Sequence, residues 1–222
     1  MSLYRVSKRK DFSPSLTNKC IILDLDETLV HTFDNFSDLE GLRPFSDPEM
    51  LDLRRRMYTF SLGSYKQAPT MWGVIRPHTD EFLEFCFSYF DKVCVWSAGL
   101  PEYVTKIVNI LFDRQPHCVH SRNHCSYAVD GNIIKPITEM SKNMEWQKEL
   151  RLDNTFFVDD RETAFIKNPY NGIVIPPYEP PASIDGFLSD DPTLPQLMDW
   201  FLLPDVIRSK DVRFLEKDYI FY

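Results

Sequence analysis

Three short apolar segments of this 222-residue chain each end at a polar side chain. The segments and the residues that follow them are 20–23 before Asp24, 93–96 before Ser97, and 155–158 before Asp159 and Asp160. Segments of this length and composition predict strands that are buried on both faces of a sheet. Apolar residues recur at helical spacing over 81–90 and 101–112, so amphipathic helices are predicted between the strands.

The alternation of strands and helices continues with a short helix predicted at 162–167 and a strand at 172–175. This order predicts an α/β fold, with a Rossmann-like parallel sheet and helices on both of its faces. In such sheets, ligands bind at the carboxyl ends of the strands. We therefore expect the polar residues that follow the three strands to line one shared crevice.

The helical alternation is interrupted between residues 31 and 75, where alternating patterns predict strands at 58–62 and 71–75. We interpret this region as a small β-rich flap, and the arginines at 54–56 as a solvated face. The predicted organisation is an N-terminal extension at 1–17, a catalytic domain at 18–178 with the flap inserted at 31–75, and a C-terminal helical segment at 179–222. We expect a helix near 194–203 in this last segment, and we expect the segment to pack on the domain, or on a second copy to form a homodimer.

Composition narrows the classes of partner and the cellular compartment. The chain has 33 acidic and 25 basic residues, a formal charge of -8, which argues against direct binding to nucleic acid or to an anionic membrane. Its five cysteines are odd in number and no apolar export segment precedes them, so we expect reduced thiols inside the cell, in the nucleus or cytoplasm. We expect no signal peptide and no transmembrane segment, because no uncharged apolar run approaches about 18 residues.

Asp24 and Asp26 lie two residues apart where the first predicted strand ends. Both carboxylates can then reach one ligand, and a third acid at a neighbouring strand end would complete an oxygen-rich site. Oxygen ligands together with a substrate phosphate favour Mg²⁺. Acidic pairs are also common in solvated turns, so this pair alone does not establish a metal site.

The longer string ILDLDETLVHT resembles the first motif of the haloacid dehalogenase superfamily of aspartate-nucleophile phosphatases. It is most similar to the branch that acts on the C-terminal domain of RNA polymerase II, the small CTD phosphatase or NLI-interacting-factor-like group. The strings VIRPHTDEFLEF, VWSAGLPEYV, SRNHCSYAVDGNIIKPIT and FVDDRETAF continue the likeness in the family's order. The resemblance covers roughly residues 18–178, which makes chance agreement very improbable.

The resemblance implies a role for each matched residue. Asp24 would be the nucleophile, Asp26 the general acid and base, and Thr28 an orienting hydroxyl. Ser97 would be the phosphate-binding hydroxyl, and Lys135 the phosphate-neutralising lysine. The metal ligands would be Asp24, Asp160 and the main chain of Asp26, with Asp159 holding Lys135 or a metal-bound water. Arg76 and Arg122 match arginines near the family's substrate.

Ordinary structural explanations compete with several of these assignments. Ser97 can be a plain strand-end hydroxyl, and the branch more often has threonine there. Lys142 rivals Lys135, and Arg76 can instead buttress the following helix. The His and Cys residues at 117–125 raise the alternative of zinc, although their spacing matches no common zinc signature.

The function that the resemblance implies is a magnesium-dependent phosphoserine or phosphothreonine protein phosphatase that works through an aspartyl-phosphate intermediate. Its expected partner is a phosphorylated protein tail with Ser-Pro motifs, such as the C-terminal domain of RNA polymerase II. One alternative is a non-catalytic peptide-binding receptor or scaffold on the same fold, similar to the mitochondrial inner-membrane translocase receptor. Another is a phosphatase for small metabolites, which the lack of a large cap domain disfavours.

Overall fold

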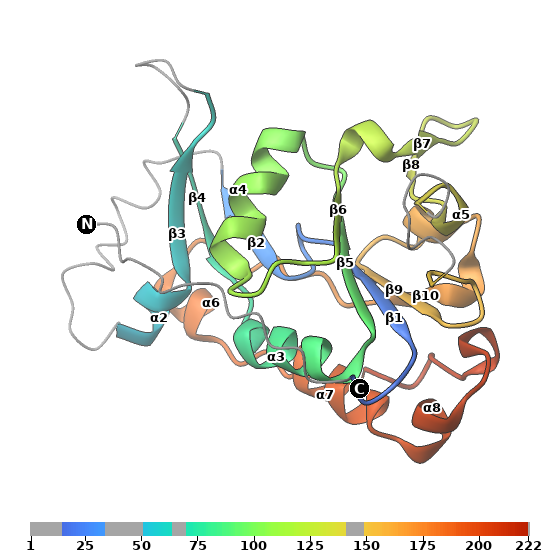
Figure 1. Cartoon of the computed structure of the whole chain (residues 1–222). Coiled ribbons are helices and arrows are strands. Elements are labelled where there is room, and N and C mark those ends of the chain that lie inside the picture. Colours follow the sequence, from blue (N-terminus) through green and yellow to red (C-terminus); the bar gives the residue numbers. More distant parts are fainter. Residues whose placement is uncertain (1–14, 34–50, 64–69, 141–148, 222) are drawn as a thin grey trace.

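The computed structural model describes residues 15–33, 51–63, 70–140 and 149–221 (Figure 1). Most of the predicted N-terminal extension, parts of the flap and Lys142 lie outside these residues. The division into domains predicted above therefore stays a prediction. None of the helices within the described ranges is long and apolar enough to cross a membrane.

A five-stranded sheet forms the centre of the molecule, and all of its pairings are parallel (Figure 1). Its strands, in spatial order, are β10 (Gly172–Val174), β9 (Thr155–Asp159), β1 (Cys20–Leu23), β5 (Lys92–Trp96) and β6 (Cys118–His120). The apolar segments that the sequence marked as strands are thus β1, β5 and β9. Because β1 is central, its carboxyl end has a strand end on either side.

Side chains of the sheet alternate between two apolar layers, as the two-residue period of a strand requires. On one face, Ile21 and Leu23 belong to the larger core, which is covered by helices α3 (Thr79–Tyr89), α4 (Pro101–Leu111) and α7 (Thr193–Phe201). On the other face, Cys20 and Ile22 pack with the short helices α5 (Ile137–Met140) and η3 (Glu162–Phe165). These observations confirm the predicted α/β sheet with helices on both faces. The segment predicted as a helix at 162–167 is the 3-10 helix η3.

A second sheet, antiparallel and three-stranded, confirms the β-rich insertion after the first motif. Its strands, in spatial order, are β2 (Val30–Phe33), β4 (Thr70–Ile75) and β3 (Met57–Ser61). Gly73 lets these strands approach, because a Cβ atom there would lie 2.3 Å from the Tyr58 hydroxyl and 2.5 Å from the His31 carbonyl oxygen. Tight packing at this point keeps Tyr58 against the middle strand.

A short helix, α2 (Leu51–Arg56), precedes β3. Arg55 is exposed, as predicted for a solvated face, but the prediction was wrong for Arg54 and Arg56. The Arg56 side chain is half-buried. Its Nη1 donates to the Ile75 carbonyl oxygen over 3.0 Å and to the Tyr178 hydroxyl over 3.4 Å, and its Nη2 donates to the Phe187 carbonyl oxygen. Arg56 therefore connects the insertion to the C-terminal part of the chain.

The C-terminal part contains α6 (Ile184–Leu188), α7, α8 (Pro204–Arg208) and the 3-10 helix η5 (Val212–Phe214). Figure 1 shows α7 beside α3 beneath the sheet, and the Tyr89 hydroxyl donates to the Phe201 carbonyl oxygen over 2.6 Å. The predicted C-terminal helix thus packs on this chain's own core, and a homodimer stays a prediction. The remaining elements are the strand pair β7 (Ser126–Tyr127) and β8 (Ile133–Ile134) and the 3-10 helices η2 (Arg122–His124) and η4 (Pro169–Asn171).

Candidate active site

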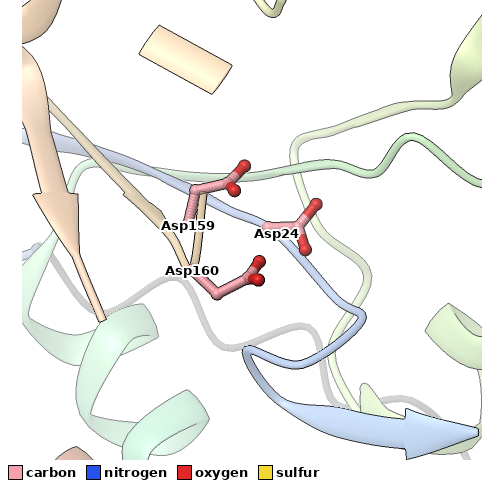
Figure 2. A group of neighbouring side chains, drawn as sticks. All are labelled: Asp24, Asp159 and Asp160. Atoms are coloured by element: carbon pink, nitrogen blue, oxygen red, sulfur yellow. The ribbon is translucent and has the colours of Figure 1, made fainter. Parts of the chain in front are cut away.

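Three carboxylates meet where β1 and β9 end. The parallel register pairs Leu23 with Val158, so the next residues, Asp24 and Asp159, are neighbours at the same edge of the sheet. Asp160 follows directly. One carboxylate oxygen of each of these three aspartates lies within 4.8 Å of the others, and Figure 2 shows the side chains directed toward a common space.

Lys135 lies between two of these carboxylates. It follows β8, and its backbone N–H donates to the Ala164 carbonyl oxygen over 2.7 Å, which anchors it beside η3. Its Nζ donates to Asp24 Oδ1 and, over 2.6 Å, to Asp159 Oδ2. Burial opposes the charge of Lys135, but the two carboxylates outweigh that effect and raise its pKa.

One ammonium group does not balance the charge of three clustered carboxylates. Burial raises the pKa of Asp24 well above its usual range, despite the opposing charge of Lys135. Burial and the charge of Asp159 raise the pKa of Asp160 to about 6. A surplus of negative charge among oxygen ligands is what a bound divalent cation would relieve, so the cluster fits a magnesium site.

Asp26 lies in the turn beyond β1, and both of its carboxylate oxygens accept hydrogen bonds. Tyr103 of α4 donates its hydroxyl to Oδ1, and Ser97 donates its own to Oδ2 over 3.2 Å. The Ser97 hydroxyl is fully buried and also accepts from the Gly99 backbone N–H over 2.9 Å. Burial raises the pKa of Asp26 and outweighs these two hydrogen bonds, which favours a protonated carboxyl group.

The turn that carries Asp26 is held in an uncommon backbone conformation. Glu27 has a φ of 56°, in the left-handed region, which costs a non-glycine residue about 1–2 kcal/mol. Its carbonyl oxygen accepts from the Tyr178 backbone N–H over 2.6 Å. Thr28 is buried, and among the described residues its hydroxyl has no hydrogen-bond partner, so its role as an orienting group stays a prediction.

Arg76 also stabilises this turn. Only 1% of the residue is exposed, and its Nη1 donates to the Thr28 carbonyl oxygen over 3.1 Å. Its Nε and Nη2 donate to the two carboxylate oxygens of Asp191 over 3.0 and 3.3 Å. Arg76 thus buttresses the preceding turn rather than the helix that follows it, and a substrate contact by Arg76 stays a prediction.

The carboxylates open onto a cavity with basic side chains on its wall. The twelve lining residues are Asp24, Asp26, Glu27, Ala98, Gly99, Arg122, Ile133, Lys135, Asp159, Asp160, Arg161 and Ala164. Arg122 is exposed, and its Nε donates to the Ala98 carbonyl oxygen over 2.7 Å, which fixes it to the loop after β5. Arg161 is also exposed and donates its backbone N–H to Asp159 Oδ1 over 2.9 Å.

The structure thus gathers most of the predicted site residues. Six of them line the cavity, namely Asp24, Asp26, Arg122, Lys135, Asp159 and Asp160. Thr28, Arg76 and Ser97 surround it without lining it. Their individual roles stay predictions.

The sequence reasoning missed Tyr103, Glu27 and Arg161. Tyr103 was counted only among the apolar residues of its helix. Arg161 had a usable signal, since it directly follows the Asp159 and Asp160 pair.

The His and Cys residues at 117–125 do not assemble a second metal site. Within the described ranges, the only group of three or more potential ligands close enough to share an ion is Asp24, Asp159 and Asp160. His117 Nδ1 accepts from the Val93 backbone N–H, and His124 Nδ1 accepts from the Ser121 backbone N–H. These rings serve backbone groups, and the zinc alternative finds no support.

A sequence model of NLI interacting factor-like phosphatases matches residues 19–213. The chain belongs to this family. The NLI interacting factor-like phosphatase fold is also seen in solved structures. The structure of Fcp1, described as an essential RNA polymerase II CTD phosphatase, aligns with a TM-score of 0.53 at 20% identity, covering 72% of this chain and 42% of that one. At that identity the likeness concerns the fold.

Two curated relatives give a measure of the distance within the family. A probable C-terminal domain small phosphatase of Dictyostelium discoideum is 27% identical over 197 residues, covering 88% of this chain and 53% of the relative. Phosphatase PSR1 of Saccharomyces cerevisiae is 28% identical over 158 residues, covering 71% of this chain and 31% of the relative. This member of the family therefore spans between about a third and a half of the length of these relatives.

Proposed function

We propose that the protein is a magnesium-dependent phosphoserine or phosphothreonine phosphatase that uses Asp24 as its nucleophile. The observation that carries the proposal is a buried Asp24 that lines the cavity together with Lys135, Asp26 and Asp160. The proposed nucleophile, cationic group, proton donor and metal ligand then all line one cavity. Membership of the NLI interacting factor-like phosphatase family supports the same reaction.

Asp24 and Asp160, with the main chain of Asp26, would hold the magnesium ion. When bound, Mg²⁺ neutralises negative charge on the phosphate and on the carboxylates that surround it. Two features support magnesium at this site: the possible ligand atoms are all oxygens, and Lys135 does not balance the negative charge of the three carboxylates.

The reaction proceeds in two transfers. An Asp24 oxygen bonds to phosphorus as the bond from phosphorus to the serine or threonine oxygen breaks, and Asp26 gives its proton to the departing oxygen. Water then attacks the aspartyl phosphate, and Asp26 takes its proton. The bond between phosphorus and Asp24 breaks, releasing inorganic phosphate and restoring both carboxyl groups.

Lys135 and Arg122 supply the positive charge that this chemistry needs. Lys135 is buried and held by Asp24 and Asp159, so it can stabilise a phosphoryl oxygen without reorganising. Arg122 lines the more exposed wall of the cavity, where a phosphorylated chain would enter. Ser97 donates its hydroxyl to Asp26 in this arrangement, and its contact with the phosphate stays a prediction.

The proposed substrate is an extended phosphorylated protein tail with Ser-Pro motifs, resembling the C-terminal domain of RNA polymerase II. Support comes from two similar proteins, Fcp1, described as an RNA polymerase II CTD phosphatase, and the Dictyostelium discoideum relative, described as a probable C-terminal domain small phosphatase. The described part of the insertion is a three-stranded sheet whose first strand, β2, begins three residues after Glu27, a residue that lines the cavity.

The decisive experiment measures phosphate release from singly phosphorylated polymerase-tail peptides, with and without Mg²⁺. Asp24→Asn should abolish release, while Asp185→Asn, an exposed aspartate on α6, should match the wild type. Full activity of Asp24→Asn, or of the wild type without any divalent ion, would overturn the mechanism. A wild-type protein that binds peptide but never releases phosphate would favour the receptor alternative, and faster turnover of sugar phosphates would favour the metabolite phosphatase.

Beryllium fluoride offers a test that needs no turnover. In the presence of Mg²⁺ it should form an adduct on the Asp24 carboxylate, detectable by fluorine NMR and absent in Asp24→Asn.

A further inference from the structure

A chain of three hydroxyl groups links the inserted sheet to Asp26. The Tyr58 hydroxyl on β3 lies 2.6 Å from Thr32 Oγ1 on β2, and Thr32 Oγ1 lies 2.7 Å from the Tyr103 hydroxyl on α4. Tyr103 then donates to Asp26 Oδ1. The four residues come from four different elements, so the fold has to bring this chain together.

The direction of the chain follows from counting hydrogens. A tyrosine hydroxyl has a single hydrogen, and Tyr103 uses it on Asp26. Thr32 must therefore donate to Tyr103, and Tyr58 must donate to Thr32. Three hydrogens fill three links, and all of them point toward Asp26 Oδ1.

The other oxygen of Asp26 has a different environment. Oδ2 accepts from Ser97 over 3.2 Å, and Ser97 is itself held by the Gly99 backbone N–H. A carboxylic acid oxygen can carry a proton and still accept one hydrogen bond. This holds for both oxygens of Asp26, so the bonds from Tyr103 and Ser97 fix a carboxyl group that can still carry a transferable proton at the wall of the cavity.

We propose that Tyr103 is a positioning residue whose hydroxyl holds the Asp26 carboxyl group at the cavity wall, in the orientation from which Asp26 gives its proton to the leaving group. This inference rests on the proposed phosphatase function. Core packing alone would be served as well by phenylalanine, since Tyr103 is 8% exposed and its ring contacts other apolar residues. The Tyr103 hydroxyl has a separate role, because its hydrogen bonds join Asp26 to Thr32 of the insertion.

The dependence of rate on the leaving group gives a specific test. A departing oxygen that receives a proton carries little negative charge, so acid catalysis makes kcat/KM insensitive to leaving-group acidity. Tyr103→Phe should lower kcat/KM for a phosphoserine peptide by roughly tenfold or more, a share of the about 10²–10⁴-fold that a positioned acid contributes. For an aryl phosphate with an acidic phenol, the loss should be under about threefold, since that group leaves without help.

Thr32→Val and Tyr58→Phe extend the test along the chain. Thr32→Val removes the donor to Tyr103 and should steepen the leaving-group dependence in the same direction but less, and Tyr58→Phe least of all. Tyr89→Phe is the matched control, because it removes a buried hydroxyl that bonds the Phe201 carbonyl oxygen and not Asp26. Thermal unfolding of each variant establishes that it is folded.

The outcomes separate the inference from the proposed function. Steepening in Tyr103→Phe and Thr32→Val, with none in Tyr89→Phe, supports the positioning role. An active wild type whose Tyr103→Phe and Thr32→Val variants lose the same factor on every ester would overturn the role of Tyr103 and leave the phosphatase assignment intact. A wild type that cleaves no ester at all would overturn the phosphatase assignment, and the inference with it.

Discussion

The ion pair between Arg76 and Asp191 gives the sharpest prediction about stability. Asp191→Asn keeps the size of the side chain and one carbonyl oxygen, which can still accept from the Thr193 backbone N–H as Asp191 does over 3.0 Å. The substitution therefore removes the charge with little change in shape. It leaves the Arg76 guanidinium, in a residue 1% exposed, without the carboxylate that balances it.

The magnitude follows from the burial of the two partners. Removing one partner of a buried ion pair costs about 3–5 kcal/mol of unfolding free energy. Asp191 is 15% exposed and asparagine retains an acceptor, so we expect a smaller loss of about 2–3 kcal/mol. For a protein of this length, that corresponds to a fall in Tm of about 4–12 °C.

Thermal and urea unfolding of Asp191→Asn would measure the loss, with Asp190→Asn as the matched control because Asp190 is the exposed neighbour. The control should stay within about 0.5 kcal/mol of the wild type. Phosphatase activity of Asp191→Asn should fall as well, since Arg76 also holds the Thr28 carbonyl oxygen behind the Asp26 turn. Equal stabilities of the two variants would refute the view that this pair supports the site.

Three further predictions concern the metal, the insertion and the thiols. Mg²⁺ at about 100 times its dissociation constant should stabilise the wild type against thermal unfolding by about 2.7 kcal/mol. Asp160→Asn should lose most of that gain, and Asp185→Asn should keep it. Equal gains in the two variants would remove Asp160 from the proposed metal site. Gly73→Ala should cost about 1–3 kcal/mol in urea unfolding, because its Cβ would lie 2.5 Å from the His31 carbonyl oxygen, and an unchanged midpoint would contradict this packing. Four of the five cysteines are buried and Cys125 is half-buried, so only Cys125 should react with a thiol reagent in the native protein. Mass spectrometry that finds Cys94 or Cys118 labelled first would contradict this prediction.

The sequence located the carboxylates of the site because their positions follow from local rules. Asp24, Asp159 and Asp160 come directly after short apolar strands, and parallel strands bring such ends to one edge. Lys135 could be chosen over Lys142 only through the motif that surrounds it. The structure then places the Lys135 ammonium group between Asp24 and Asp159.

Interactions between distant segments were not accessible in the same way. Tyr103 lies on the apolar stripe of α4, where the spacing indicates burial and says nothing about the hydroxyl. Its partner Asp26 is 77 residues away in the sequence, and Arg76 and Asp191 are 115 apart. No periodic pattern marks such pairs, because each partner alone looks like an ordinary core or surface residue. Arg56 was placed on a solvated face for the same reason.

The residues that hold the turn at Asp26 show why the C-terminal part of the chain matters to the candidate site. Glu27 adopts a left-handed conformation that its own sequence does not favour, so other segments must stabilise the turn. Two hydrogen bonds do so directly, from the Tyr178 N–H to the Glu27 carbonyl oxygen and from Arg76 to the Thr28 carbonyl oxygen. Arg76 in turn depends on Asp191, which lies beyond the segment that carries the motifs. A variant that weakens this support should therefore reduce catalysis without altering any residue that lines the cavity.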